Sequence, residues 1–141
     1  MSIPAVRFRV DFRRDAAVGP GKISLLEHIG ACGSLSQAAR ELHMSYRRAW
    51  QLLESLNGCF REPVAITSRG GRGGGGAILT GLGRQLISLY RAFERQTQAR
   101  AARCFGPIAG KVRNLGSPGA AARRAGRGTG AAAPIRLLQR R

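Results

Sequence analysis

The fold is decided by residues 34–60, which read SLSQAARELHMSYRRAWQLLESLNGCF. The first four residues match the Ser-x-x-Gln capping box that opens a helix. Only residues 43–45 separate the short helix that follows from a second capped start at Ser45. From there, apolar residues recur on one face of a helix over about residues 46–60. Two short helices joined by so tight a turn are typical of a helix-turn-helix, whose second helix enters the major groove of DNA.

The sequence after this motif predicts a β-hairpin. Pro63 ends the preceding helix, and residues 64–68, VAITS, read as a strand. The loop RGGRGGGG, residues 69–76, leads to a second strand at 77–80. A hairpin with a basic, glycine-rich tip directly after a helix-turn-helix is the wing of a winged-helix fold. We therefore expect a mostly α fold with a small β-hairpin.

The flanking segments complete this domain. Residues 6–12 alternate apolar and polar side chains and predict a strand, which the run 18–21, VGPG, ends. From Lys22 to about Gly30 the apolar spacing is that of a helix.

A long helix is expected to follow the hairpin. A helical stripe over residues 81–103 contains Leu82, Leu86, Leu89, Tyr90 and Phe93. A helix of this length would reach roughly 35 Å, which is more than one small domain covers. We expect its distal half to pack on a second subunit, so that the protein is a homodimer.

The charge is distributed over two unlike segments. The chain has 141 residues and a formal net charge of +17. Residues 1–105 hold sixteen basic and seven acidic side chains, a net charge of +9. Residues 106–141 are mainly Ala, Gly, Arg and Pro, with a net charge of +8 and no aromatic residue. The composition predicts a folded domain over 1–105 and a disordered basic tail over 106–141.

The net charge predicts a polyanionic partner. Double-stranded DNA is the first candidate, and an anionic membrane surface is the second. No apolar run approaches the roughly 20 residues of a membrane span. Residues 1–12 lack the layout of a signal peptide. We therefore expect no membrane partner and a cytoplasmic, nucleoid-associated location.

We expect neither a metal site nor a catalytic site. Cys32, Cys59 and Cys104 show no C-x-x-C spacing and fit reduced thiols. His28 and Cys32 are four residues apart on one predicted helix, but a zinc site needs four suitably spaced ligands. No arrangement of serine, histidine and acid suggests catalysis. We expect neither an enzyme nor a bound cofactor.

The predicted helix 46–60 carries the candidate base-reading residues. Arg47 fits a bidentate contact with guanine and Gln51 one with adenine, whereas the position of Arg48 suits a phosphate contact. Tyr46 either contacts DNA through its hydroxyl or packs under the preceding helix. Trp50 is expected to be structural. A solvated helix face with some basic residues is the alternative interpretation.

We expect the hairpin loop to contact DNA phosphates, and the starts of the two helices are a second candidate for such contacts. Arg69 and Arg72 would approach phosphates or the minor groove from the wing tip, where glycine permits close contact. The alternative is a flexible surface hairpin; a P-loop is excluded because its Gly-Lys-Ser/Thr is missing. Ser34, Ser36 and Ser45 lie at the starts of the two short helices. Plain capping is the favoured role for their hydroxyls, and binding a phosphate is the second.

The sequence resembles a known family. The runs ISLLEHIGACGSLSQAAR (23–40), MSYRRAW (44–50) and GGRGGGGA (70–77), followed by Leu79-Thr80 and Gly83, resemble the N-terminal domain of the ModE family. Those proteins are bacterial molybdate-responsive transcription regulators. The resemblance covers about residues 6–105 and implies a winged helix-turn-helix, DNA binding and a dimer.

The resemblance stops where the basic tail begins. In full-length members of the family, a pair of small β-barrel modules that bind molybdate follows this domain. Residues 106–141 have no strand alternation and no oxyanion pocket, so molybdate sensing is not expected within this chain. The tail either strengthens DNA binding non-specifically or is a readthrough or out-of-frame segment. A sequence-specific regulator, a non-specific nucleoid protein and a DNA-binding subunit of a separate molybdate-binding protein remain the alternatives.

Overall fold

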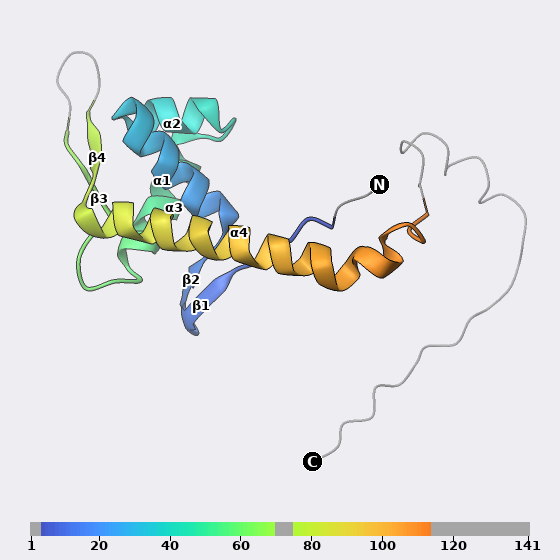
Figure 1. Ribbon diagram of the computed structural model, residues 1–141. Helices are drawn as coiled ribbons and strands as arrows, with labels where there is room; N and C mark the ends of the chain where they lie inside the picture. Colours follow the sequence, from blue (N-terminus) through green and yellow to red (C-terminus); the bar gives the residue numbers. More distant parts are fainter. Residues whose placement is uncertain (1–3, 70–74, 114–141) are drawn as a thin grey trace, which may run out of the picture.

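The computed structural model describes residues 4–69 and 75–113 (Figure 1). Within these residues it contains four helices and two two-stranded antiparallel sheets. Helices α1, α2 and α3 gather at one end of the long helix α4 together with both hairpins, and the other end of α4 projects past them. None of the helices in these two ranges has the length and apolarity needed to cross a membrane.

Helix α1, Pro20–Cys32, is the central element of the core. It begins two residues before the predicted start, because proline suits the first position of a helix. Gly33 ends it in the left-handed region, with φ of 67°, and donates its N–H to the Ile29 carbonyl at 2.9 Å. The side chains of α1 that are buried are Ile23, Leu25, Leu26 and Ile29.

Helices α2, Leu35–Glu41, and α3, Tyr46–Asn57, begin where the sequence predicts. The Ser34 hydroxyl accepts a hydrogen bond from the N–H of Gln37 at 3.2 Å, and Ser45 accepts one from the N–H of Arg48 at 3.1 Å. The Gln37 side chain is hydrogen-bonded to Glu41, one turn along the helix. Both predicted starts are therefore built by serine caps.

Helix α3 ends at Asn57, three residues before the predicted end. The reason is a contact with the following hairpin. The Asn57 side chain accepts a hydrogen bond from the N–H of Val64 at 2.8 Å and donates one to the carbonyl of Ala65 at 3.2 Å. These bonds fix the chain reversal between α3 and β3, and Phe60 lies in that reversal instead of in the helix.

The second hairpin consists of β3, Ala65–Thr67, and β4, Ala77–Leu79, in a register that pairs Ile66 with Ile78. Both strands are shorter than predicted. The N–H of Ala77 donates to the Gly33 carbonyl at 2.8 Å, so the hairpin is attached to the end of α1. Most of the loop between the strands lies outside the described residues.

The predicted strand over 6–12 is shifted in the structure. Strand β1, Val10–Arg13, pairs with β2, Ala16–Val18. Residues 6–9 have no strand opposite them, because β2 ends at Val18. They run along α4 instead, where the N–H of Val6 donates to the side chain of Gln98 at 2.8 Å.

Helix α4, Gly81–Ala109, is longer than the predicted helix over 81–103 and continues past residue 105, where the predicted domain ends. The buried residues of this helix all lie in its first ten positions: Gly83, Leu86 and Tyr90. Gly83 is needed there, because a Cβ at this position would lie 2.0 Å from the Val64 carbonyl oxygen. The predicted apolar stripe is split, since Leu89 and Phe93 are exposed.

Candidate nucleic-acid interface

Helix α3 is anchored by one face and exposes the other. Ala49, Leu53 and Leu56 are buried, and this apolar face packs on α1 and α2. Arg47 and Gln51 lie on the opposite face by the helical step and are exposed. The residues predicted to read bases are therefore accessible to a partner along one side of the helix.

Trp50 is more exposed than the structural role predicted from the sequence implies. Its exposed fraction is 46%, and that of Tyr46, one turn earlier, is 55%. The smaller Ala49 and the neighbouring Leu53 occupy the buried face of α3, so the two aromatic rings lie beside it. Tyr46 therefore does not pack under α2 as a buried residue.

The two rings line a hollow between α2, α3 and the hairpin of β3 and β4. Its volume is about 230 Å³. Its walls come from the start of α2, the first half of α3 and the ends of β3 and β4, and the lining residues are Leu35, Ser36, Tyr46, Trp50, Thr67, Ser68, Arg69, Gly75 and Gly76. The fold thus brings together three of the predicted residues, Ser36, Tyr46 and Arg69.

Ser68 holds the hairpin side of this hollow in place. Its hydroxyl accepts a hydrogen bond from the N–H of Gly76 at 3.1 Å and donates one to the Gly76 carbonyl at 3.3 Å. The N–H of Ser68 also donates to that carbonyl at 2.8 Å. No local pattern in the sequence singles out Ser68 or Thr67, because their role depends on where the hairpin packs.

The other predicted residues differ in their surroundings. Ser34 and Ser45 use their hydroxyls as helix caps, whereas Ser36 is exposed at the hollow. Arg48 is exposed on α3, and the helical step places it across the buried face from Tyr46 and Trp50, which line the hollow. Arg72 lies outside the described residues.

The arginines of α3 carry free positive charge. The ion pairs found in the described part of the chain join Arg9 to Asp11, His28 to Glu41, and Arg91 to Glu27 and Glu94. None of these involves Arg47, Arg48 or Arg69. The described residues contain no group of three or more histidine, cysteine or acidic side chains placed to hold a metal ion. A polyanion is the partner that this electrostatic arrangement favours.

Comparison with known proteins finds relatives among the ModE and Mop proteins. It is 37% identical over 99 residues to the molybdenum transport protein ModE of Azotobacter vinelandii, which covers 67% of this chain and 37% of that protein. It is 43% identical over 82 residues to the molybdenum-pterin-binding protein MopB of Rhodobacter capsulatus. This match covers 58% of this chain and 30% of that protein. It is 44% identical over 71 residues to the DNA-binding transcriptional dual regulator ModE of Escherichia coli. This match covers 50% of this chain and 27% of that protein.

The chain is a homologue of the ModE and Mop proteins over part of their length. It spans about a third of the length of these relatives. No protein-family profile matches it.

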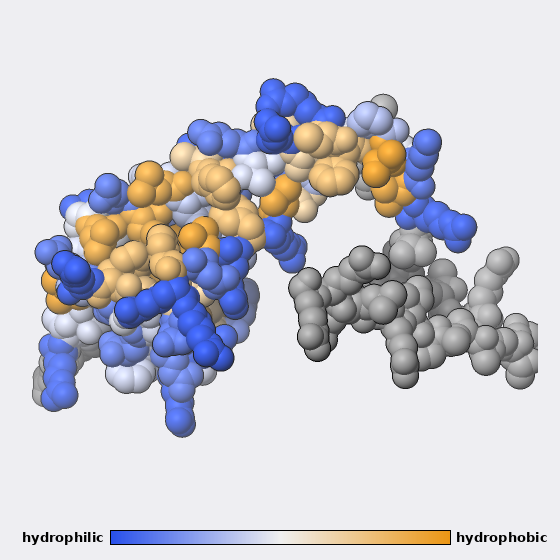
Figure 2. Space-filling view, turned by 90° about the horizontal axis from the view of Figure 1, so that it is seen from below, coloured by the Kyte–Doolittle hydropathy of each residue, from blue (hydrophilic) through white to orange (hydrophobic). Residues whose placement is uncertain are grey.

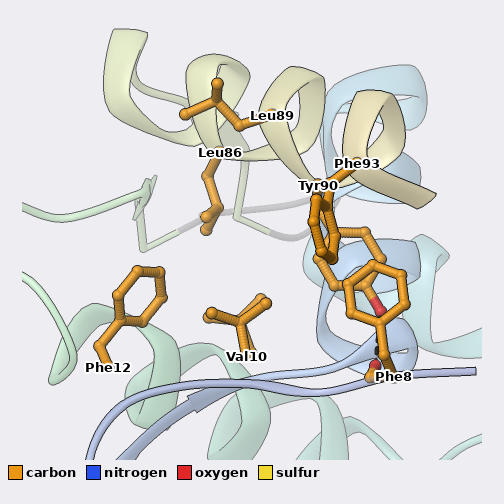
Figure 3. Close-up of a pocket in the computed structure, with 8 residues that line it drawn as sticks. Phe8, Val10, Phe12, Leu86, Leu89, Tyr90 and Phe93 are labelled. Atoms are coloured by element: carbon orange, nitrogen blue, oxygen red, sulfur yellow. Dashed lines mark hydrogen bonds between the residues drawn. The ribbon is translucent and has the colours of Figure 1, made fainter. Parts of the chain in front are cut away.

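A second surface of this ModE homologue is an apolar groove between β1 and α4 (Figure 3). Its volume is about 190 Å³, and its lining is Phe8, Val10, Phe12, Val18, Leu86, Leu89, Tyr90 and Phe93. Leu89 is 62% exposed and Phe93 is 53% exposed. Figure 2 shows hydrophobic side chains gathered over this face and continuing onto the projecting part of α4.

Two contacts fix the position of α4 behind this groove. The Tyr90 hydroxyl donates to the Phe8 carbonyl at 2.9 Å, and the Tyr90 ring stacks on that of Phe8 with centroids 4.6 Å apart. Burial raises the pKa of the Tyr90 phenol, and the charge of Glu94 adds to this effect while Arg91 opposes it. Arg91 bonds to both carboxylate oxygens of Glu27 on α1, at 2.5 and 3.2 Å. The hydrogen bonds of Arg91 with Glu27 and Glu94 raise the pKa of its guanidinium above the ordinary value for arginine.

Proposed function

We propose that this chain is a sequence-specific DNA-binding transcription regulator of the ModE type. In this proposal α2, the turn and α3 form a helix-turn-helix, and β3 with β4 forms its wing. The observation that carries it is the exposed side of α3: Arg47 and Gln51 are exposed on its outer face, and the neighbouring Tyr46 and Trp50 line a hollow together with Arg69 of the hairpin. The relative from Escherichia coli is described as a DNA-binding transcriptional regulator, which supports the same function here.

Each candidate residue has a role that follows from its position. Arg47 contacts guanine and Gln51 contacts adenine in the major groove, because their side chains present the matching donors and acceptors. Arg48 contacts a backbone phosphate, since it lies toward the edge of the exposed face. Arg69 and Arg72 contact phosphates or the minor groove through the wing.

We propose a homodimer formed through the groove between β1 and α4. The exposed Phe12, Leu89 and Phe93 line one continuous apolar surface, and such surfaces on small proteins mark contact sites. Two copies joined across this face would place two α3 helices in related positions. The preferred DNA site would then have two-fold symmetry.

The function in the cell is tested by a genome-wide map of the DNA bound by the full chain. We expect discrete peaks near promoters that share one short motif. Even coverage of the chromosome would contradict the proposal and favour a non-specific nucleoid protein. The observation behind that second candidate is residues 106–141, which hold eight basic and no acidic side chains.

The link to molybdenum is proposed from the relatives alone. Their names refer to molybdenum transport or to molybdenum-pterin binding. We propose that this chain acts in the same metabolism through a separate molybdate-binding protein, in the cytoplasm and on the nucleoid, and that it is not an enzyme. Calorimetric titration of the chain with molybdate should give no heat of binding; a saturable heat would contradict a separate sensor.

A further inference from the structure

Two aromatic side chains of α3 are exposed although the helix has a well-buried apolar face. Tyr46 and Trp50 lie one turn apart on the side of the helix that faces the hairpin. Within the described residues, neither the Tyr46 hydroxyl nor the Trp50 indole N–H has a hydrogen-bond partner. Tyrosine and tryptophan are enriched at contact surfaces, because each ring combines an apolar body with a polar group.

The surroundings of the rings indicate the chemistry of the partner. The hollow that they line has Arg69 and the hydroxyls of Ser36 and Thr67 on its other walls, and no acidic residue among the residues that line it. Arg47 lies beside Tyr46 on the same helix. The patch thus combines a local apolar contact with positive charge around it. DNA offers the complementary pair, because its backbone is anionic and its major groove contains one apolar group, the methyl group of thymine.

We propose that Tyr46 and Trp50 recognise thymine through contact of their rings with its 5-methyl group in the major groove. This inference rests on the proposed function, in which α3 lies in that groove. Arg47 and Gln51 would recognise guanine and adenine by hydrogen bonds, and the aromatic pair would add selection for thymine at neighbouring positions. Trp50 thereby becomes a specificity-determining residue.

The test removes the methyl groups one at a time. A preferred duplex is first selected from a random pool with the full chain, and each thymine in it is then replaced by deoxyuridine, which lacks only the methyl group. With the wild type, we expect about a three- to fivefold loss of affinity at one or two positions in each half-site, in line with the burial of one methyl group. Trp50→Ala should bind the thymine duplex more weakly and no longer distinguish it from the deoxyuridine duplex.

Two further variants separate contact from folding. Trp50→Phe keeps an apolar ring and should retain most of the discrimination. Ile78→Ala removes an exposed apolar side chain of β4 that does not line the hollow, and it should discriminate like the wild type. Thermal melting of all variants checks that the fold is kept.

A direct readout is available because the chain has a single tryptophan. The preferred duplex should protect Trp50 fluorescence from quenching by acrylamide. Replacement of the critical thymine by 5-iododeoxyuridine should give a light-induced crosslink that mass spectrometry places at Tyr46 or Trp50.

The outcomes distinguish this inference from the proposed function. If no duplex is preferred, the proposed function is wrong and the inference falls with it. If a preferred duplex exists but Trp50→Ala keeps the full methyl dependence, thymine recognition by the pair is wrong while the regulator stands. A bound duplex that leaves acrylamide quenching unchanged also overturns the inference, because the rings are then free for another partner, such as a protein.

Discussion

Arg47 is the residue on which base recognition depends most in the proposed interface. It is exposed on the outer face of α3, and in the described part of the chain no carboxylate pairs with it. We predict that Arg47→Ala lowers the affinity for the preferred duplex by about tenfold to a hundredfold, because a bidentate contact with guanine is lost. Binding to random duplexes should change far less, as fluorescence anisotropy at one fixed salt concentration would show.

Arg48 provides the matched control for this prediction. It is also exposed on the same helix, but its position suits a phosphate contact. Arg48→Ala should weaken binding to all duplexes alike and reduce the slope of log affinity against log salt by about 0.9. An equal loss on all duplexes with Arg47→Ala would make that residue a phosphate contact too.

Gly83 is the residue at which packing of α4 against the hairpin base is tightest. A Cβ there would meet the Val64 carbonyl oxygen at 2.0 Å, whereas a Cβ at Gly81 would have no atom within 4 Å. We predict that Gly83→Ala lowers the free energy of unfolding by about 1–3 kcal/mol, since the backbone must shift to relieve the overlap. In urea denaturation, Gly81→Ala should be neutral or slightly stabilising. Equal stabilities for the two variants would contradict the close packing.

At the scale of elements, the starts of α2 and α3 were predictable and several element ends were not. Ser34 and Ser45 are followed by amphipathic segments, and capping is a local interaction that the sequence contains in full. The end of α3 depends on Asn57 bonding to residues seven and eight positions away. The place of residues 6–9 depends on contacts with α4, including Val6 to Gln98. Such distant contacts have no signature in a local pattern.

The candidate site was also predictable only where local periodicity decides the position of a residue. The positions of Arg47 and Gln51 on the outer face of α3 follow from helical periodicity, and the structure exposes both residues. The exposure of Trp50 was missed because periodicity places it near the apolar edge, and only the packing of Ala49 and Leu53 decides on which side of that edge the ring lies. The hollow beside it needs the hairpin in place, which no local pattern specifies.

The element that we expect to join two copies is α4. We predict that Leu89→Asp shifts the protein from dimer to monomer, because a buried, unpaired carboxylate in the apolar groove is strongly unfavourable. Sedimentation equilibrium at several concentrations measures this change. Ser88→Asp adds the same charge at an exposed position that does not line the groove, and it should leave the mass unchanged. A monomeric wild type would overturn the proposed dimer.

At the scale of the whole molecule, positive charge is shared between the described helical domain and the C-terminal segment. The net charge of the chain is +17. Six arginines and no acidic residue lie after residue 113. We predict that a chain ending at residue 113 binds all duplexes more weakly at low salt but keeps the ratio between preferred and random duplexes. The slope of log affinity against log salt should fall by up to about five. Loss of the ratio itself would assign specificity to the C-terminal segment instead of α3.

In the proposed function, α3 and its neighbouring hairpin select particular DNA sequences. The measurement that tests it most directly is repeated selection of bound duplexes from a random pool by the full chain, followed by sequencing. We predict one enriched motif with two-fold symmetry, whose half-sites are centred about one or more helical turns of DNA apart, at roughly 34 Å per turn. A final pool with no enriched motif, bound as tightly as the starting pool, would contradict sequence-specific recognition.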